Sequence, residues 1–161
     1  MPKAEPQQKT NETMTILHHE IQINAPVSKV WKILANLEEV AKYNPLVKHT
    51  DNVGEKRACL DAERHCNFKD GGFSNERVIK FEPERVIGIE IVKSSWPLVF
   101  CRWYTKLEPK NGGTFVSQDL EYEVKFGVLG KLMDAFMMKR KFNQILNDIF
   151  AGMKKYAEKS V

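Results

Sequence analysis

The fold is decided by the stretch Thr15-Ile16-Leu17-His18-His19-Glu20-Ile21-Gln22-Ile23-Asn24 and by the residues directly after it, Ala25-Pro26-Val27-Ser28-Lys29-Val30-Trp31. The first part is typical of a β-strand over about residues 14–24. The second part predicts the start of a short amphipathic helix, because proline is tolerated at the first helical position and apolar residues follow at helical spacing. A second short helix over 38–43 should end before Pro45, since the residue preceding a proline avoids the helical region.

The middle of the chain, residues 46–126, predicts a series of strands separated by turns. Lys69-Asp70-Gly71-Gly72 indicates a hairpin that joins a strand over 57–68 to a strand over 73–81. Apolar and polar residues alternate along the strand over 113–126, so one of its faces should contact solvent, as is common in antiparallel sheets. The other face carries Val116, Gln118, Leu120, Tyr122 and Val124.

The end of the chain is its strongest helix prediction, from about Lys131 to Lys159. Apolar residues recur there at steps of three and four and form a stripe that a sheet can bury. The stripe, which includes one residue just before the expected helix, consists of Leu129, Leu132, Met133, Phe136, Met137, Ile145, Leu146, Ile149, Phe150, Met153 and Tyr156. This order of elements predicts an α+β fold in which a curved antiparallel sheet meets a long C-terminal helix. Where sheet and helix part, a pocket for a small apolar molecule can form.

Length and composition indicate one ordinary globular domain. At 161 residues, 42% apolar and 29% charged, the chain fits a single domain over 14–161, preceded by a polar, proline-containing tail over 1–13 that we expect to be disordered. No apolar run is long enough for a membrane span, and the first residues do not form a signal peptide. Three cysteines, an odd number, favour reduced thiols and a cytoplasmic location.

Several classes of function lack support in the sequence. The net charge of +4 comes without a basic block interleaved with aromatic residues, so we expect no nucleic-acid partner. Walker, GxGxxG, GxSxG and HExxH motifs are missing as well. Cys59 and Cys66 lie seven residues apart and would point to opposite faces of a regular strand. Cys59 and His65 share a face but would be about 20 Å apart. We therefore expect no metal ion and no cofactor.

The motifs taken in order resemble the START-like (SRPBCC) superfamily with the helix-grip fold. The resemblance covers about residues 14–158 and is nearest to the polyketide cyclase/dehydrase and lipid-transport-like branch. It rests on Ile23-Asn24-Ala25-Pro26-Val27-Ser28-Lys29-Val30-Trp31, Tyr43-Asn44-Pro45, Gly54–Cys59, Gly72–Val78, Gly112–Val116 and Phe126–Leu132. It implies the element order β-α-α-β-β-β-β-β-β-α, with a bent sheet wrapped around the last helix and a cavity between them.

Strand parity together with the resemblance suggests which residues line such a cavity. Two of them depart from the family pattern, because Tyr43 and Gln118 stand where many members carry tryptophan, which implies a more polar or roomier pocket. Arg57 and Glu76 would form its polar end if both face inward; otherwise one or both lie at the rim in solvent. The candidate ligand-binding residues are Tyr43, Arg57, Cys59, Glu76, Ile89, Trp96, Trp103, Gln118, Tyr122, Met133, Phe136 and Met137.

Three functions remain open at this point. The first is binding or transport of a hydrophobic small molecule, such as a lipid, a quinone or a polyketide-like compound. The second is a polyketide cyclase or dehydratase activity that uses Arg57, Glu76 and Tyr122 as acid, base or anchor. The third is a protein-interaction module, as in co-chaperone or ribosome-associated members of the superfamily, with Trp96-Pro97-Leu98-Val99-Phe100 as an exposed apolar patch. The protein is expected to be a monomer or a homodimer.

Overall fold

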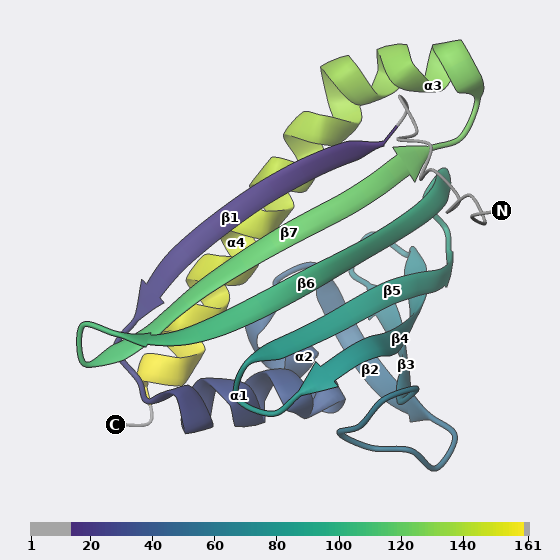
Figure 1. The fold of residues 1–161 in the computed structure, drawn as a ribbon. Helices are drawn as coiled ribbons and strands as arrows, with labels where there is room; N and C mark the ends of the chain where they lie inside the picture. Colours follow the sequence, from purple (N-terminus) through teal and green to yellow (C-terminus); the bar gives the residue numbers. More distant parts are fainter. Residues whose placement is uncertain (1–13, 160–161) are drawn as a thin grey trace, which may run out of the picture.

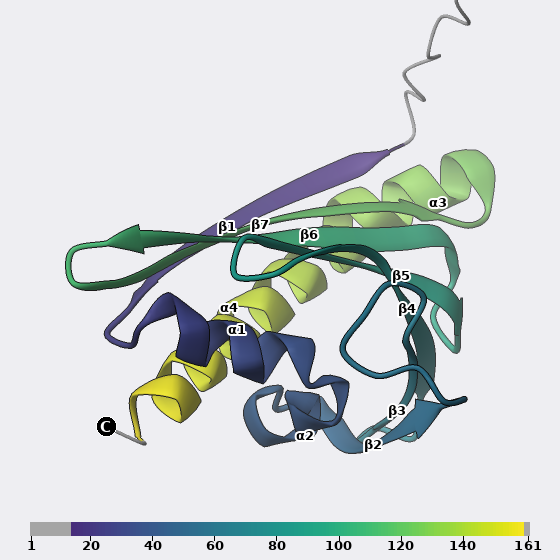
Figure 2. The same ribbon diagram turned by 60° about the horizontal axis from the view of Figure 1, so that its bottom comes forward.

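A curved antiparallel sheet wraps around one long C-terminal helix in the computed structural model of the protein (Figures 1 and 2). The structure describes residues 14–159, so the expected tail over 1–13 lies outside the described residues. The elements are β1 (Thr15–Ile23), α1 (Val27–Ala35), the 3-10 turn η1 (Leu37–Glu39), α2 (Val40–Tyr43), β2 (Val47–Val53), β3 (Glu63–Phe68), β4 (Phe73–Glu82), β5 (Val86–Ser94), β6 (Leu98–Lys110), β7 (Gly113–Val124), α3 (Gly127–Met133), the π-helical segment η2 (Asp134–Met138) and α4 (Lys139–Glu158).

The seven strands follow the order β1-β7-β6-β5-β4-β3-β2, and every neighbouring pair is antiparallel. β1 therefore pairs with β7 at one edge of the sheet. The segment with α1 and α2 connects β1 to β2, which forms the opposite edge. Figure 2 shows how the sheet bends so that α1, α2 and α4 all lie on its concave side. The predicted helix-grip arrangement is confirmed.

The long helix is held against the sheet by a narrow stripe of side chains. Along α4 the fully buried positions recur at helical steps and are Phe142, Leu146, Phe150, Met153 and Ala157. Gly152 permits a close approach to α2, because a Cβ atom there would stand 2.0 Å from the carbonyl oxygen of Tyr43. Among residues 14–159, no helix is long and apolar enough to cross a bilayer.

Two elements differ from their predicted limits. The strand expected over 57–68 begins only at Glu63, because Ala58 and Asp61 take left-handed backbone conformations (φ 43° and 60°) that end any extended run before it. The closing helix begins at Gly127 rather than near Lys131, and a π-helical segment separates α3 from α4. Both differences change which side chains face inward.

The buried side chains form two clusters that meet beneath α4. The larger one joins α1, α2, the C-terminal half of α4 and residues from every strand. The smaller one joins β1, β6, β7 and the N-terminal half of α4. Trp96 and Trp103 pack against both clusters. The cavity described next lies between these clusters and has both tryptophans in its wall.

Candidate ligand-binding cavity

A cavity of about 100 Å³ lies between the concave face of the sheet and α4. Its wall is mostly apolar, and a few polar groups converge in it. The lining residues are Asn44, Leu46, Arg64, Phe68, Glu76, Ile91, Trp96, Cys101, Trp103, Gln118, Leu120, Phe142, Ile145, Leu146 and Ile149. Pockets for drug-sized ligands enclose roughly 300–1,000 Å³. This cavity therefore accepts only a small molecule unless lining side chains move.

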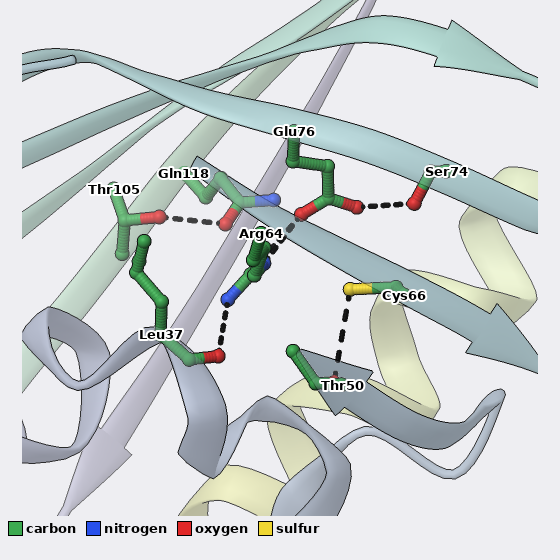
Figure 3. A network of polar contacts seen from close by, with 8 residues as sticks. All are labelled: Leu37, Thr50, Arg64, Cys66, Ser74, Glu76, Thr105 and Gln118. Carbon is green, nitrogen blue, oxygen red and sulfur yellow. Dashed lines mark hydrogen bonds and ion pairs between the residues drawn. The ribbon is translucent and has the colours of Figure 1, made fainter. Parts of the chain in front are cut away.

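The polar part of the wall centres on a buried ion pair between Arg64 and Glu76 (Figure 3). The guanidinium group contacts one carboxylate oxygen, Oε2, from two nitrogens: Nε donates at 2.7 Å, and Nη2 lies at 2.6 Å. Its Nη1 donates to the backbone carbonyl of Leu37 at 3.2 Å. The other carboxylate oxygen of Glu76, Oε1, accepts a hydrogen bond of 2.7 Å from the hydroxyl of Ser74. These contacts satisfy the carboxylate on both oxygens.

Strand pairing explains why the two charges meet. In the β3–β4 hairpin Arg64 pairs directly with Glu76, and Cys66 with Ser74. The even-numbered residues of β3 and residues 74, 76 and 78 of β4 are buried, so each pair points to the concave side. Side chains that face each other across an antiparallel pair have Cβ atoms about 5 Å apart, within reach of a direct ion pair.

The ion pair places one positive and one negative charge in the cavity wall, so the net charge of the pair is zero. Burial alone would lower the pKa of the Arg64 guanidinium, yet the adjacent Glu76 carboxylate raises it above its ordinary value. Arg64 therefore stays protonated at every pH at which the protein is folded. Burial also raises the pKa of the nearby Tyr43 hydroxyl, which stays protonated at neutral pH. A ligand meets a balanced dipole rather than a free positive charge.

A second polar contact involves Gln118 of β7. The hydroxyl of Thr105 donates to the side-chain carbonyl of Gln118 at 2.7 Å. This bond orients the amide of Gln118, which lines the cavity beside Arg64 (Figure 3). Arg64 and Gln118 both carry N–H groups, so the wall presents hydrogen-bond donors to a ligand oxygen.

The thiols of the buried cysteines are unreactive at neutral pH. Burial raises the pKa of the Cys66 thiol to about 12, with a further contribution from Glu76. Burial likewise raises the pKa of Cys101, which lines the cavity. Both are protonated thiols at neutral pH, and a protonated thiol is a poor nucleophile. Within residues 14–159, no group of three His, Cys, Asp or Glu residues is arranged to hold a metal ion.

Four of the candidate residues lie together in the cavity wall: Glu76, Trp96, Trp103 and Gln118. Others are inside the protein but outside this wall. Tyr43 and Ile89 are buried in the larger cluster, Cys59 packs against it, and Met133 packs against the smaller one. The hydroxyl of Tyr122 donates to Asp134 of η2 at 2.5 Å.

Three candidate residues point away from the cavity. Arg57 was expected to face inward, but it is exposed in the loop before β3 and donates to the backbone carbonyls of Gly54 and Lys56. Of the two alternatives for Arg57 and Glu76, the structure shows the one in which Arg57 lies in solvent, and the partner of Glu76 is Arg64. Phe136 and Met137 are 74% and 67% exposed, because η2 presents Asp134 to the sheet and these two side chains to solvent.

Sequence reasoning missed Arg64 and Phe68 on β3 and Phe142 on α4. Arg64 could have been found from the hairpin. Counting outward from the turn at Asp70 places residue 64 opposite residue 76, whereas we counted from a strand start at 57 that does not exist. No comparable local signal marks Phe142, whose place depends on where α4 crosses the sheet.

The family described as polyketide cyclase/dehydrase and lipid transport matches residues 14–158. The chain belongs to this family. The predicted resemblance is thereby confirmed. No curated protein matches the sequence.

Solved structures share the fold of this family member at low sequence identity. A START superfamily protein from Mycobacterium smegmatis is 15% identical and superposes with a TM-score of 0.76, covering 91% of this chain and 99% of that one. The major latex-like protein 151 of Panax ginseng is 10% identical with a TM-score of 0.75 and covers the same shares. XoxI from Bacillus cereus is 14% identical with a TM-score of 0.69, covering 88% and 94%. At these identities the likeness concerns the fold.

Proposed function

We propose that the protein binds a neutral, largely apolar small molecule that carries a carbonyl or hydroxyl oxygen, in the cavity between the sheet and α4. Quinones, polyketide-like compounds and lipids with a small polar end have this chemistry. The observation that carries the proposal is the buried Arg64–Glu76 pair in an otherwise apolar wall. A buried ion pair is a weak source of stability, since desolvation offsets most of the attraction. Its position in a cavity supports a role in recognition.

The charge balance favours a neutral ligand over an anion. A carboxylate ligand would bring a second negative charge close to Glu76, whose carboxylate already pairs with Arg64. A carbonyl oxygen needs only hydrogen-bond donors, which Arg64 and Gln118 supply. The ligand therefore gains specificity from one oxygen and affinity from the apolar wall.

The cavity volume sets a second condition. About 100 Å³ is too small for a lipid chain or a polycyclic compound. Trp96, Ile145 and Ile149 are only half-buried in the wall, so they can move aside at lower cost than the fully buried lining residues. Binding of a larger ligand should therefore include a displacement of these side chains.

The site geometry favours binding over cyclase or dehydratase chemistry. Tyr122, one of the acid–base candidates, is committed to Asp134 and does not line the cavity. Glu76 is bonded on both oxygens. The thiol of Cys66 is held protonated. A general base needs an open position within hydrogen-bond reach of its substrate, and none of these groups offers one.

The interaction-module alternative is weakened at the predicted patch. Trp96 lines the cavity and Leu98 is buried, which leaves Val99 as the strongly exposed apolar residue of that segment.

The test compares two one-ring probes of similar shape, acetophenone and ethylbenzene, by isothermal titration calorimetry. Only the ketone offers an acceptor, and a hydrogen bond to a charged donor contributes about 1.5–3 kcal/mol. We expect the ketone to bind roughly tenfold or more tightly. Ile145→Trp, which fills the cavity, should abolish binding, and Asn147→Trp on the exposed side of α4 should not. Equal affinities of the two probes, or binding by the filled variant, would contradict the proposal.

A further inference from the structure

The segment between β7 and α4 exposes a run of large apolar side chains. α3 turns away from the end of β7 and projects past the edge of the sheet, as Figures 1 and 2 show. We call this run the α3 surface. Its side chains are between 58% and 84% exposed and are Phe126, Val128, Leu129, Leu132, Phe136 and Met137.

Such a concentration of exposed apolar side chains indicates a surface that binds a partner. Single exposed apolar residues are normal on any protein, but contiguous patches mark surfaces that bind something. Phe126 adds a conformational cost to this exposure, because it holds a left-handed backbone (φ 78°) at the start of α3 while its ring is 68% exposed. Non-glycine residues adopt this region rarely. The chain thus directs an aromatic ring into solvent at the tip of the surface.

The charge of the same segment identifies the kind of partner. Five of the 25 basic residues and one of the 21 acidic residues lie between 125 and 141, so this segment carries the same net charge, +4, as the whole chain. The basic residues are Lys125, Lys131, Lys139, Arg140 and Lys141, all exposed. The one acid, Asp134, accepts hydrogen bonds from Thr15 and Tyr122 and is directed at the sheet. Lys131 and Lys139 border a hollow that also contains Glu123 and Asp134, and Lys141 lies over the ring of Trp96 at 5.5 Å. The α3 surface is therefore apolar and is carried by a segment of net positive charge.

We propose that the α3 surface docks on an anionic lipid bilayer. Its apolar side chains would enter the boundary between headgroups and acyl chains, while the lysines of the same segment and Arg140 contact the headgroups. A second copy of the chain fits less well, because a symmetric contact would bring two segments of charge +4 together. The inference rests on this surface alone and stands whether or not the cavity binds a ligand.

The first experiment measures co-sedimentation of the full chain with vesicles of phosphatidylcholine containing 30% phosphatidylglycerol, and with vesicles of phosphatidylcholine alone. We expect binding to the anionic vesicles that is at least tenfold tighter and is lost in 0.5 M NaCl, because salt screens the attraction. The triple variant Lys131→Gln, Lys139→Gln, Lys141→Gln should bind roughly 100-fold more weakly, about fivefold for each charge. The matched control is Lys32→Gln, Lys48→Gln, Lys93→Gln, which removes the same charge from exposed sites elsewhere.

The second experiment tests the apolar contribution. Leu129→Ser with Phe136→Ser should weaken binding to the anionic vesicles at least tenfold, whereas Ile16→Ser with Val92→Ser, also exposed, should not. Phe136→Trp provides a direct readout, since lipids brominated on their acyl chains quench an inserted tryptophan. A tryptophan placed at Val92 should stay unquenched. All these sites are exposed, so the variants should fold.

Three results would overturn the proposal. One is the absence of binding to either kind of vesicle. Another is equal loss of binding in the two triple lysine variants, which would show that only the overall charge matters. The third is a concentration-dependent dimer in sedimentation velocity that disappears in Leu129→Ser with Phe136→Ser while vesicles bind neither protein. That outcome would assign the α3 surface to a second copy.

Discussion

Arg64 and Glu76 face each other on β3 and β4 with almost no contact to water. Arg64 is 4% exposed and Glu76 is 8% exposed. Removing one partner of a buried ion pair leaves the other charge uncompensated, which costs about 3–5 kcal/mol. Removing both and filling the space with apolar groups costs far less. The pair therefore contributes little net stability, although each member depends strongly on the other.

This asymmetry gives the first prediction. Arg64→Met should lower the free energy of unfolding by about 3–5 kcal/mol, and Arg64→Met with Glu76→Leu should recover at least half of that loss. Urea unfolding measures both. The control is Arg77→Met, which breaks a cross-strand pair with Glu90 on the solvated face of β4 and should cost at most about 1 kcal/mol. Equal losses in the single and double variants would show that packing of the arginine stem, rather than charge, decides the effect.

The cysteines allow a second prediction at the same scale. In the native protein iodoacetamide at pH 8 should modify Cys59, which is partly exposed, and leave Cys66 and Cys101 unmodified. Burial raises the pKa of Cys66 to about 12, so its thiolate is scarce at this pH and becomes common only near that value. Peptide mass spectrometry after short reaction times gives the order. Equal modification of Cys59 and Cys66 would mean that the β3 region opens readily.

Arg57 and Arg64 show what the sequence could and could not predict about the site. The alternation of β7, which places Gln118 on the cavity side, was readable from residue types alone. Strand parity also placed Glu76 inside. The error at Arg57 came from the start of β3, because the left-handed residues Ala58 and Asp61 carry no glycine signal. Regular alternation from Arg57 would bury the odd-numbered residues of β3, but the irregular backbone at Ala58 and Asp61 breaks this alternation, and the even-numbered residues are buried.

At the scale of elements, one side chain of η2 makes its hydrogen bonds to the sheet, beside the apolar contact of Met138 with the smaller buried cluster. The carboxylate of Asp134 accepts hydrogen bonds from Thr15 of β1 at 2.6 Å and from Tyr122 of β7 at 2.5 Å. Burial and the hydrogen bond to Asp134 raise the pKa of Tyr122, so its hydroxyl remains a donor at neutral pH. α3 and η2 share few buried side chains with the sheet, so this carboxylate provides most of the directional contact.

Asp134→Ala should therefore release α3 and η2 without unfolding the rest. It leaves the Tyr122 hydroxyl unpaired in a buried position and should cost about 1–3 kcal/mol. Amide hydrogen exchange should become faster over residues 127–138 and stay unchanged in β4 and β5. Asp148→Ala, on the exposed side of α4, is the matched control. Unchanged exchange over 127–138 would mean that apolar contacts alone hold this segment.

The pairing of β1 with β7 should depend on pH through His18 and Asp119, which face each other across the two strands. Hydrogen bonds to Asp119 and then to Glu20 raise the pKa of His18 above 6.5. The stability that this histidine contributes is therefore complete below pH 6.5 and is lost as the pH rises through the raised value. Both groups are largely solvent-exposed, so the contribution is at most about 1 kcal/mol. NMR titration should show the pKa of His18 falling toward 6.5 in Asp119→Asn, and an unchanged value would exclude Asp119 as the cause.

The closing helix shows what an apolar pattern can and cannot predict about the burial of a helix. Its apolar stripe predicted a helix that the sheet buries, and this holds from Phe142 onward. The same pattern continues through Leu129, Leu132 and Phe136, but there the helix presents Met133 and Asp134 inward and the apolar stripe faces solvent. A stripe predicts that something covers it, but the rotation of the helix decides whether that is the protein itself. The π-helical segment η2 changes this rotation, and the apolar pattern alone does not indicate it.

For the molecule as a whole, occupation of the cavity should appear as thermal stability, because a ligand that binds only the native state adds RT ln(1 + [L]/Kd) to the free energy of unfolding. At a free concentration of acetophenone 100 times its Kd this amounts to about 2.7 kcal/mol, which raises the Tm of a domain of this size by roughly 5–10 °C. In Ile145→Trp the larger side chain occupies the cavity, so the Tm of this variant should not change when the ketone is added. The Tm of Asn147→Trp should rise as it does for the unsubstituted protein. Differential scanning calorimetry separates these cases. An equal rise in the filled variant would place the ligand elsewhere on the molecule, and the cavity would then be only a packing gap between the two buried clusters.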